Sequence, residues 1–189
     1  MIGRLFLAYF GKRNIRGLAY IGKGSSISGI PKCIHGSCLY IGDNVDIHSG
    51  ARIENPSKNP NIKIMFGNNC CAWFNFTILA GADVTIGNNV AIASDVFISS
   101  GGHMTDPESD ISYGGQPYVG KPVVIKDGAW IGQKVCILGG VTIGQKSIIG
   151  AGSVVVNNIP DYCIAVGNPA KVVKRYDFET HEWEKVING

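Results

Sequence analysis

An aliphatic residue recurs at every sixth position over much of this chain, a period that no helix or ordinary strand explains. An α-helix returns to one face every 3.6 residues and a half-buried strand every two residues. The repeat is unbroken from residue 125 to residue 155, at Ile125, Ile131, Ile137, Ile143, Ile149 and Val155. Earlier anchors with the same spacing are Ile21, Ile27, Ile41, Ile47, Ile53, Phe66, Ala72, Ile78, Ile86, Ile92 and Ile98.

Small residues accompany the anchors in a constant register. The residue directly after an anchor is often glycine, and the residue four positions later is small or β-branched. Examples of the second kind are Val45, Ala51, Val90, Ala129 and Ser147. This pattern predicts one short extended segment and one tight turn per repeat, with three segments forming a triangular coil. Stacked coils are expected to pair as parallel strands about 4.8 Å apart and to bury their anchors against one another.

Three segments interrupt the period and divide the chain. Residues 54–63 hold two prolines, so we expect a surface loop there. Residues 104–120 contain no anchor and are predicted to form an extruded loop, since unstructured insertions of that length are usually functional. We expect a cap over residues 1–20 and a β-helix domain over residues 21–172. The tail, residues 173–189, is predicted to form a short amphipathic helix.

The composition narrows the classes of partner. The net charge is only +3 and no basic run carries interleaved aromatic residues, so nucleic-acid binding is not expected. A mildly basic chain suits a small anionic ligand that carries phosphates. No stretch is long enough to cross a membrane, and the basic segment around Lys12 and Arg16 allows at most peripheral contact with one. Six cysteines without framework spacing, and no recognisable signal peptide, predict a reduced, cytoplasmic protein.

Several stretches resemble one family. They are "IGNNVAIASDVFISSGGH", "DGAWIGQKVCILGGVTIGQKSIIGAGSVVV" and "IPDYCIAVGNPAKVV". They look like the hexapeptide-repeat acyltransferases, and most like the branch of acetyl-CoA-dependent sugar O-acetyltransferases that includes enzymes of bacterial surface polysaccharides. The resemblance covers residues 66–174 strongly and residues 21–55 weakly.

The resemblance implies a fold, an assembly and a reaction. The implied fold is all-β, a left-handed parallel β-helix, and the hand comes from the resemblance alone. The implied assembly is a homotrimer with active sites in the clefts between prisms. The implied reaction uses acetyl-CoA as co-substrate, requires no metal, and acetylates a hydroxyl of a small-molecule or glycan acceptor. The expected pathway is the biosynthesis of lipopolysaccharide, capsule or exopolysaccharide.

His103 is the candidate catalytic base. It ends a regular coil and opens the insertion at residues 104–120. A sugar hydroxyl is a poor nucleophile without help, and a neutral imidazole is a base that works near pH 7. The resemblance implies that the histidine of "GGH" removes the hydroxyl proton. The group that orients the imidazole is left open among the nearby carboxylates and a backbone carbonyl. Those carboxylates are Asp106, Glu108 and Asp110.

The acceptor site departs from the family pattern. The sugar acetyltransferases carry Asn-Phe-Asn on the coil before the histidine, whereas this chain has Trp73 in place of the first asparagine and keeps the second as Asn75. Residues 79–81, Leu-Ala-Gly, replace the acidic positions of the family. Trp73 and Asn75 are therefore the predicted acceptor-binding residues. The indole of Trp73 either stacks on a sugar ring or fills a gap between subunits.

The resemblance also implies a coenzyme A site. The tryptophan of "WIG" is expected to line the slot for the pantetheine arm, and small residues leave room for the arm beside the backbone. Lysines after "GNPA" are expected to meet the phosphates. The family lysine before "IP" is absent, and asparagine stands in that stretch. The implied cofactor-binding residues are Trp130, Gln133, Ala151, Gly152, Asn157, Lys171 and Lys174.

Four alternatives compete with this reading. The acceptor group is an amine if the enzyme is an N-acetyltransferase acting on an amino sugar or another small acceptor. A covalent acyl-cysteine would use Cys136 or Cys70, which we interpret instead as packing residues. A zinc enzyme resembling the γ-class carbonic anhydrases needs three converging histidines, and only His103 and His48 lie in clear repeats. A non-catalytic scaffold would not need the histidine, tryptophan and "GNPA" motifs together.

Overall fold

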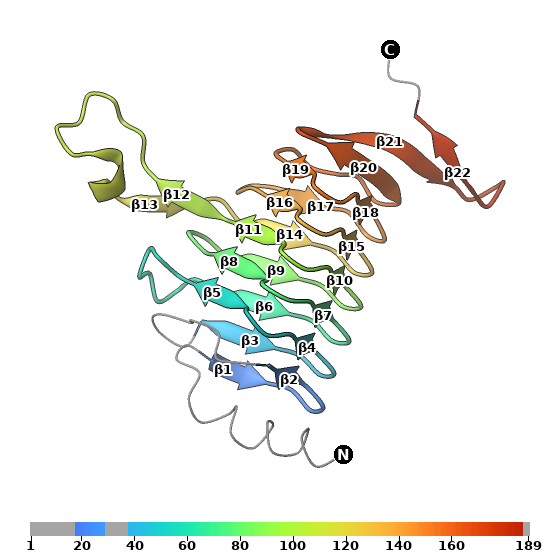
Figure 1. The fold of residues 1–189 in the computed structure, drawn as a ribbon, viewed down its shortest axis with the longest axis horizontal. Coiled ribbons are helices and arrows are strands. Elements are labelled where there is room, and N and C mark those ends of the chain that lie inside the picture. Colours follow the sequence, from blue (N-terminus) through green and yellow to red (C-terminus); the bar gives the residue numbers. More distant parts are fainter. Residues whose placement is uncertain (1–17, 29–37, 187–189) are drawn as a thin grey trace.

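The structure is a computed structural model that describes residues 18–28 and 38–186. The described chain winds as the predicted left-handed parallel β-helix, with short strands stacked coil upon coil into three sheets (Figure 1). Each complete coil contributes one strand to each sheet in turn. Most of the expected cap over residues 1–20 lies outside the described residues, and Leu18 already belongs to the first strand.

The strands of the prism fall into three ladders. Sheet 1 holds β1 (Leu18–Ile21), β3 (Leu39–Ile41), β6 (Ile64–Phe66), β9 (Val84–Ile86), β14 (Val123–Ile125) and β17 (Thr142–Ile143). Sheet 2 begins with β2 (Ser26–Ile27), β4 (Asp46–Ile47), β7 (Cys71–Ala72), β10 (Ala91–Ile92), β15 (Trp130–Ile131) and β18 (Ile148–Ile149). Sheet 3 holds β5 (Arg52–Glu54), β8 (Thr77–Leu79), β11 (Phe97–Ser99), β16 (Cys136–Ile137) and β19 (Val154–Val155).

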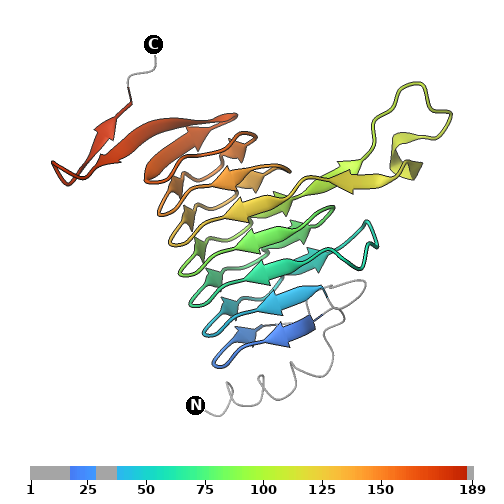
Figure 2. The same cartoon turned by 180° about the vertical axis from the view of Figure 1, so that it is seen from behind.

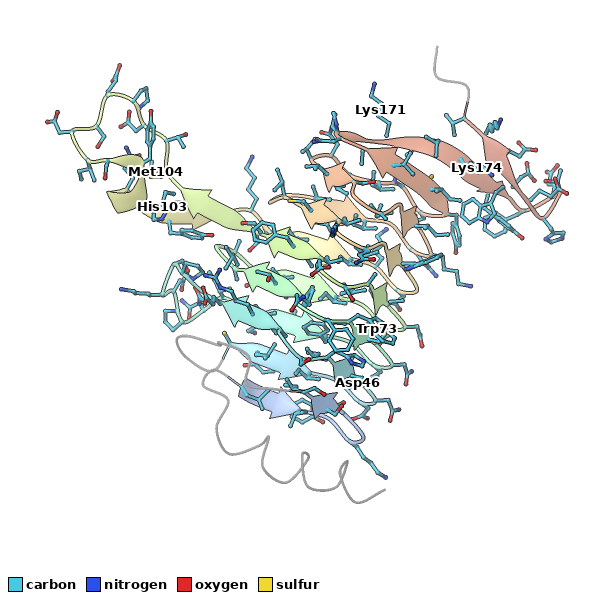
Figure 3. All side chains as sticks on the ribbon, in the orientation of Figure 1. Asp46, Trp73, His103, Met104, Lys171 and Lys174 are labelled. Carbon is cyan, nitrogen blue, oxygen red and sulfur yellow. The ribbon has the colours of Figure 1, made fainter. Side chains whose placement is uncertain are left out.

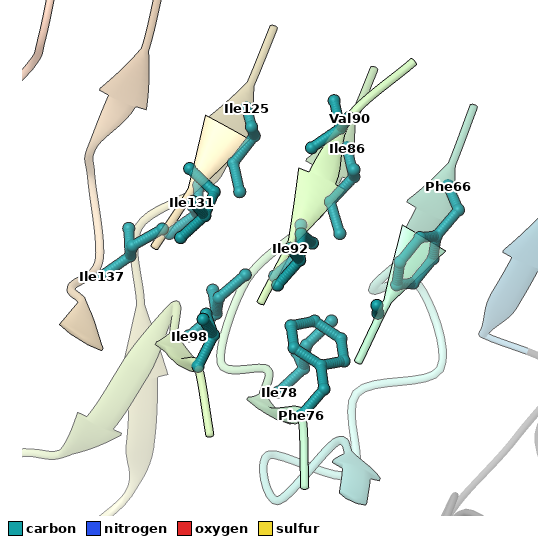
Figure 4. Close-up of a cluster of buried hydrophobic side chains, with 14 of the residues drawn as sticks. Phe66, Phe76, Ile78, Ile86, Val90, Ile92, Ile98, Ile125, Ile131 and Ile137 are labelled. Atoms are coloured by element: carbon teal, nitrogen blue, oxygen red, sulfur yellow. The ribbon is translucent and has the colours of Figure 1, made fainter. Parts of the chain in front are cut away.

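The strand register confirms the six-residue repeat as the basis of the core. Anchors pair with anchors, as in Ile92 with Ile131 and Ile98 with Ile137. These side chains are fully buried and point into the prism (Figure 4). Because each coil buries its anchors only between its neighbours, stability comes from stacking rather than from any single coil.

One coil departs from the repeat and compensates within itself. Its sheet 2 anchor is Ala72, where an isoleucine is usual, and its small position before β8 is instead Phe76. Phe76 and the anchor Phe66 are both buried and meet edge to face, with ring centroids 6.0 Å apart (Figure 4). The two rings fill the space that the small Ala72 side chain leaves in this coil. Volume-conserving rearrangements of this kind are tolerated in cores.

The corners are stacked turns held by asparagine ladders. At the corner between sheets 1 and 2, the Asn44 side chain donates to Asn69 at 3.1 Å, and Asn69 donates to Asn89 at 3.3 Å. All three adopt positive φ. Asparagine is among the few residues that tolerate this conformation, so it suits the tight turns that the repeat predicts.

Two insertions leave the prism at the corner between sheets 3 and 1 (Figures 1 and 2). Residues 55–63 form the expected loop after β5. The second insertion projects from the prism as expected, and its base is an ordered antiparallel hairpin (Figure 1). It starts before residue 104, with β12 (Gly101–His103) pairing antiparallel with β13 (Tyr118–Gly120). Its tip carries a single 3₁₀ turn, η1 (Tyr113–Gly115).

The predicted C-terminal helix is wrong. Sheet 2 continues instead through β20 (Cys163–Gly167), β21 (Ala170–Asp177) and β22 (Glu182–Lys185), and the last two strands pair antiparallel. Asp177 Oδ1 accepts the backbone N–H groups of Glu179 and Thr180 and so closes a tight turn. Tyr176 then lies opposite Trp183 with their ring centroids 5.3 Å apart. Cross-strand aromatic pairs stabilise hairpins, which explains why the helical spacing of apolar residues did not decide the structure.

Candidate active site

The hairpin that carries His103 is rooted in the prism by Ser100. This side chain is fully buried, and its Oγ accepts the backbone N–H groups of Gly81 and Ala82, each at 3.1 Å. The same hydroxyl donates to the carbonyl of Ala82 at 2.7 Å. A Cβ atom at Gly101 or Gly120 would collide with neighbouring backbone, so glycine permits the close strand crossing here.

His103 is exposed, yet both its ring and one ring nitrogen have defined partners. The ring meets the Tyr118 ring edge to face, with centroids 5.2 Å apart. Nδ1 lies 2.8 Å from the backbone carbonyl oxygen of Gln116. A carbonyl oxygen only accepts hydrogen bonds, so Nδ1 carries the proton and Nε2 keeps a free lone pair in the neutral ring.

This geometry resolves which group orients the imidazole. Among the described residues, none of Asp106, Glu108 and Asp110 forms an ion pair with His103. Asp106 instead accepts the backbone N–H of Glu108 at 2.9 Å. The orienting group is the backbone carbonyl of Gln116, one of the alternatives that the sequence left open.

The predicted acceptor residues lie at the corner between sheets 2 and 3, which we call the 2–3 corner. Trp73 is 46% exposed, and its indole stacks on His48 with centroids 4.5 Å apart and planes 5° from parallel. Asp46 lies 3.5 Å from His48. Asn75 adopts positive φ and donates from Nδ2 to Asp95 at 3.0 Å. The Trp73 ring therefore has a stacked partner in His48, and the Asn75 amide is already hydrogen-bonded to Asp95.

Asp95 was not predicted from the sequence. It occupies the positive-φ position of its turn, and Gln133 also donates to it, at 3.3 Å. The hydrogen bonds from Asn75 and Gln133 lower the pKa of the Asp95 carboxyl below its ordinary value. The available signal was its register, because Asp95 lies 20 residues after Asn75, one coil further along.

Side-chain size changes sharply along the 2–3 corner. His48, Trp73, Ala93, Gly132 and Gly150 occupy equivalent positions, since each backbone N–H bonds to the anchor carbonyl of the next coil. The two large rings stack at the N-terminal end of this column. Beyond Trp73, along the upper coils, the side chains are a methyl group or absent, and the two glycines pack closely on the next coil. A Cβ atom would lie 2.7 Å from Ala151 N at Gly132 and 2.7 Å from Val166 Cγ1 at Gly150.

The predicted coenzyme residues occupy those upper coils. Trp130 on β15 is 53% exposed on the outer face of sheet 2. Gln133, Ala151 and Gly152 are exposed in the 2–3 corner, and a Cβ atom at Gly152 would meet nothing within 4 Å. Asn157 is exposed just beyond β19. Lys171 is exposed on β21, whereas Lys174 on the same strand is half-buried.

A single chain does not bring these groups together. In Figure 3, His103 lies on its hairpin at one side of the prism, whereas Trp73 lies at the opposite side. Lys171 and Lys174 are on β21 at the C-terminal end. The hairpin that carries His103 leaves the prism at the corner between sheets 3 and 1, so the width of sheet 3 separates it from the 2–3 corner.

Among residues 18–28 and 38–186, no group of three or more His, Cys, Asp and Glu side chains is placed to hold a metal ion. Cys33 and His35 lie outside the described residues. No helix in the described ranges has the length and hydropathy of a membrane span.

Comparison with known proteins agrees with the fold. The family described as "Bacterial transferase hexapeptide (six repeats)" matches residues 122–157. A putative acetyltransferase of Saccharomyces cerevisiae is 46% identical over 112 residues, 59% of this chain and 56% of the relative. Galactoside O-acetyltransferase of Escherichia coli is 40% identical over 131 residues, 66% of this chain and 63% of the relative. The chain thus spans less than two thirds of the length of these curated relatives.

A solved structure shares the architecture over nearly the whole chain. AntD, an N-acyltransferase from Bacillus cereus solved with dTDP-4-amino-4,6-dideoxyglucose and coenzyme A, superposes with a TM-score of 0.71. The match covers 92% of this chain and 90% of AntD at 19% identity, a similarity of fold alone. The coils, the corner ladders and the hairpin define a left-handed β-helix of the hexapeptide-repeat class. The chain is similar to hexapeptide-repeat acyltransferases in the repeats of residues 122–157 and in its alignment with galactoside O-acetyltransferases.

Proposed function

We propose that the protein is an acetyl-CoA-dependent O-acetyltransferase that moves an acetyl group to a sugar hydroxyl, with His103 as general base. The observation that carries this proposal is the hydrogen bond from His103 Nδ1 to the Gln116 carbonyl. It leaves Nε2 unprotonated on an exposed hairpin, as a base for a hydroxyl must be. The pathway that we propose is bacterial surface polysaccharide biosynthesis, on the motif resemblance.

The chemistry requires one base and no covalent enzyme intermediate. Nε2 of His103 takes the proton of the acceptor hydroxyl while the hydroxyl oxygen attacks the thioester carbonyl carbon. The tetrahedral intermediate collapses, the carbon–sulfur bond breaks, and the acetyl ester forms. The departing thiolate of coenzyme A takes the proton from the imidazolium, which restores the base. Tyr118 and the Gln116 carbonyl hold the ring throughout.

The 2–3 corner is the proposed binding surface. We assign the acceptor to the exposed indole of Trp73 and the neighbouring Asn75, because an aromatic face suits the apolar face of a sugar ring. We assign the pantetheine arm to the open backbone near Ala151 and Gly152, beside the exposed Trp130. Gln133, Asn157, Lys171 and Lys174 are proposed to contact the rest of the coenzyme, with the lysines on its phosphates.

A homotrimer completes this site. His103 and Trp73 lie on opposite sides of one prism (Figure 3). In the proposed trimer, the hairpin of one chain reaches the 2–3 corner of the adjacent chain. Exposed apolar side chains on the hairpin support this contact, among them Met104, Ile111, Tyr113 and Val119. Light scattering tests the assembly, and a monomer at micromolar concentration contradicts a shared site.

The test of the reaction is thiol release from acetyl-CoA against a panel of sugars, nucleotide sugars and amino sugars. We expect turnover with a hydroxyl acceptor. An amine-only product, shown by mass spectrometry, would contradict O-acetylation. Coenzyme binding is measured separately by calorimetry, and its absence would contradict the donor assignment.

A matched pair of variants tests the base. His103→Asn keeps a donor near the Gln116 carbonyl but removes the base, so turnover should fall by about 10²- to 10⁴-fold, roughly 3–5 kcal/mol of barrier. His181→Asn changes an exposed histidine in the β21–β22 turn and should leave turnover unchanged. A folded His103→Asn enzyme that works within threefold of wild type shows that His103 is not the base.

A further inference from the structure

We propose that Gln116 is a positioning residue whose side chain organises the hairpin so that His103 is held as the Nδ1–H tautomer. The inference rests on the proposed function for its kinetic consequence, whereas its structural claim about the tautomer stands independently. Gln116 touches no substrate in this proposal. It acts only through the ring of His103.

The hairpin segment has almost no buried side chains apart from Gln116. Over residues 101–122 it is the only buried residue, at 5% exposure, whereas its neighbours are exposed or half-buried. A hairpin with so little apolar burial has few contacts to hold one conformation. Its order must therefore come largely from hydrogen bonds.

The side-chain amide of Gln116 supplies those hydrogen bonds. Oε1 accepts the backbone N–H of Asp106 at 3.0 Å. Nε2 donates to the carbonyl of Asp106 at 2.9 Å and to the carbonyl of Ile111 at 3.0 Å. One side chain thus joins two separate parts of the loop and uses both of its amide donors. Hydrogen bonds of this kind are costly to lose when the group is buried.

The backbone of Gln116 is tied as firmly as its side chain. Its N–H bonds to the carbonyls of Ser112 and Tyr113, each at 3.2 Å. Its carbonyl accepts Nδ1 of His103 at 2.8 Å. The peptide that orients the imidazole is therefore fixed by five polar contacts of the same residue.

The tautomer decides whether His103 can act as a base. When Nδ1 has no fixed acceptor, a neutral imidazole can carry its proton on either nitrogen. A ring with the proton on Nε2 cannot accept the proton of a hydroxyl at that atom. Loss of the Gln116 side-chain bonds should loosen the carbonyl and increase this inactive fraction.

The alternative is that Gln116 only stabilises the loop. Gln116→Met separates the two roles, because methionine keeps the length and the burial but makes none of the three amide hydrogen bonds. Thr105→Ala is the matched control, an exposed position on the same hairpin. Gln116→Glu is a second variant, which keeps an acceptor for Asp106 N–H but lacks the two donors.

The decisive measurement is the ¹⁵N spectrum of histidine-labelled protein, which distinguishes protonated from bare ring nitrogens. The His103 signals are assigned by their loss in His103→Asn. We expect a bare Nε2 in the wild type and in Thr105→Ala, and a shift towards Nε2–H in Gln116→Met or Gln116→Glu. Circular dichroism confirms that each variant is folded.

Kinetics give the second readout. Turnover should fall about tenfold in Gln116→Met while KM for acetyl-CoA stays within twofold, since the coenzyme residues lie elsewhere. Unchanged His103 signals, unchanged turnover, or a change in KM alone would each overturn the positioning role. If the wild type acetylates nothing, the proposed function fails, but the spectra still decide whether Gln116 sets the tautomer.

Discussion

Restoring the repeat at Ala72 should destabilise the protein. Isoleucine is the usual anchor, so a rule based on the sequence pattern predicts that Ala72→Ile is stabilising. The structure predicts the opposite, because Ala72 is fully buried in the coil that also buries Phe66 and Phe76. The two rings, 6.0 Å apart, already supply the extra volume of that coil (Figure 4).

The size of the effect follows from overpacking. Isoleucine adds three carbon atoms at a site of 0% exposure, between the paired anchors Ile47 and Ile92. Added methylenes in a filled core typically cost about 1–3 kcal/mol. For a chain of this size, each kcal/mol lowers the melting temperature by roughly 2–4 °C. Melting is compared at one protein concentration, since assembly also affects it.

A second substitution tests the reason for the loss. Phe76→Val alone should leave a cavity. Its loss of stability should be smaller than the roughly 3–5 kcal/mol that truncation of a buried phenylalanine to alanine costs. The double variant Ala72→Ile/Phe76→Val should lose less stability than the two single variants lose in sum, because one change fills the space that the other opens. Ala91→Ile, on the outer face of β10, is the control for the same chemical change. An Ala72→Ile protein that melts at or above the wild-type temperature would refute the packing argument.

Two further predictions concern the cysteines and the acid limb of stability. Burial raises the pKa of the Cys136 thiol, so Cys136 should react with iodoacetamide more slowly than glutathione does. Cys136→Ala should retain turnover within twofold of wild type. A large loss of turnover would favour an acyl-cysteine intermediate. The Lys126 ammonium, and then the Gln145 backbone N–H, lower the pKa of the Asp161 carboxyl in the folded protein. The carboxylate therefore stabilises the fold fully above its unfolded pKa of about 3.9, and this stabilisation is lost as the pH falls through the lower folded pKa. Melting temperatures at pH 6 and pH 3 should therefore differ less in Asp161→Asn than in the wild type, and an equal difference would show that this carboxylate contributes nothing.

The fold was largely predictable from the sequence because its information is local and repeated. An anchor such as Ile131 meets only residues one coil away, so a spacing of six specifies strand, turn and register together. The Asx corners were predictable for the same reason, since Asn44, Asn69 and Asn89 carry the turn conformation themselves. His103 was singled out as the candidate base by its position where the period stops and by the "GGH" resemblance, and this role stays a prediction.

The tertiary structure decided what depends on contacts outside the repeat. The tail became β21 and β22 because the open edge of sheet 2 offered hydrogen bonds and Tyr176 met Trp183 across the turn, contacts that helical periodicity does not encode. The orientation of His103 depends on the carbonyl of Gln116, thirteen residues away, and a backbone carbonyl has no signature in a sequence. Asp95 joined Asn75 and Gln133 only when the coils were stacked. The sequence by itself determined where each coil turns, because that is a property of single residues and near neighbours. Only the folded chain determined which polar groups meet, because an insertion and a sheet edge place residues by three-dimensional contact rather than by spacing.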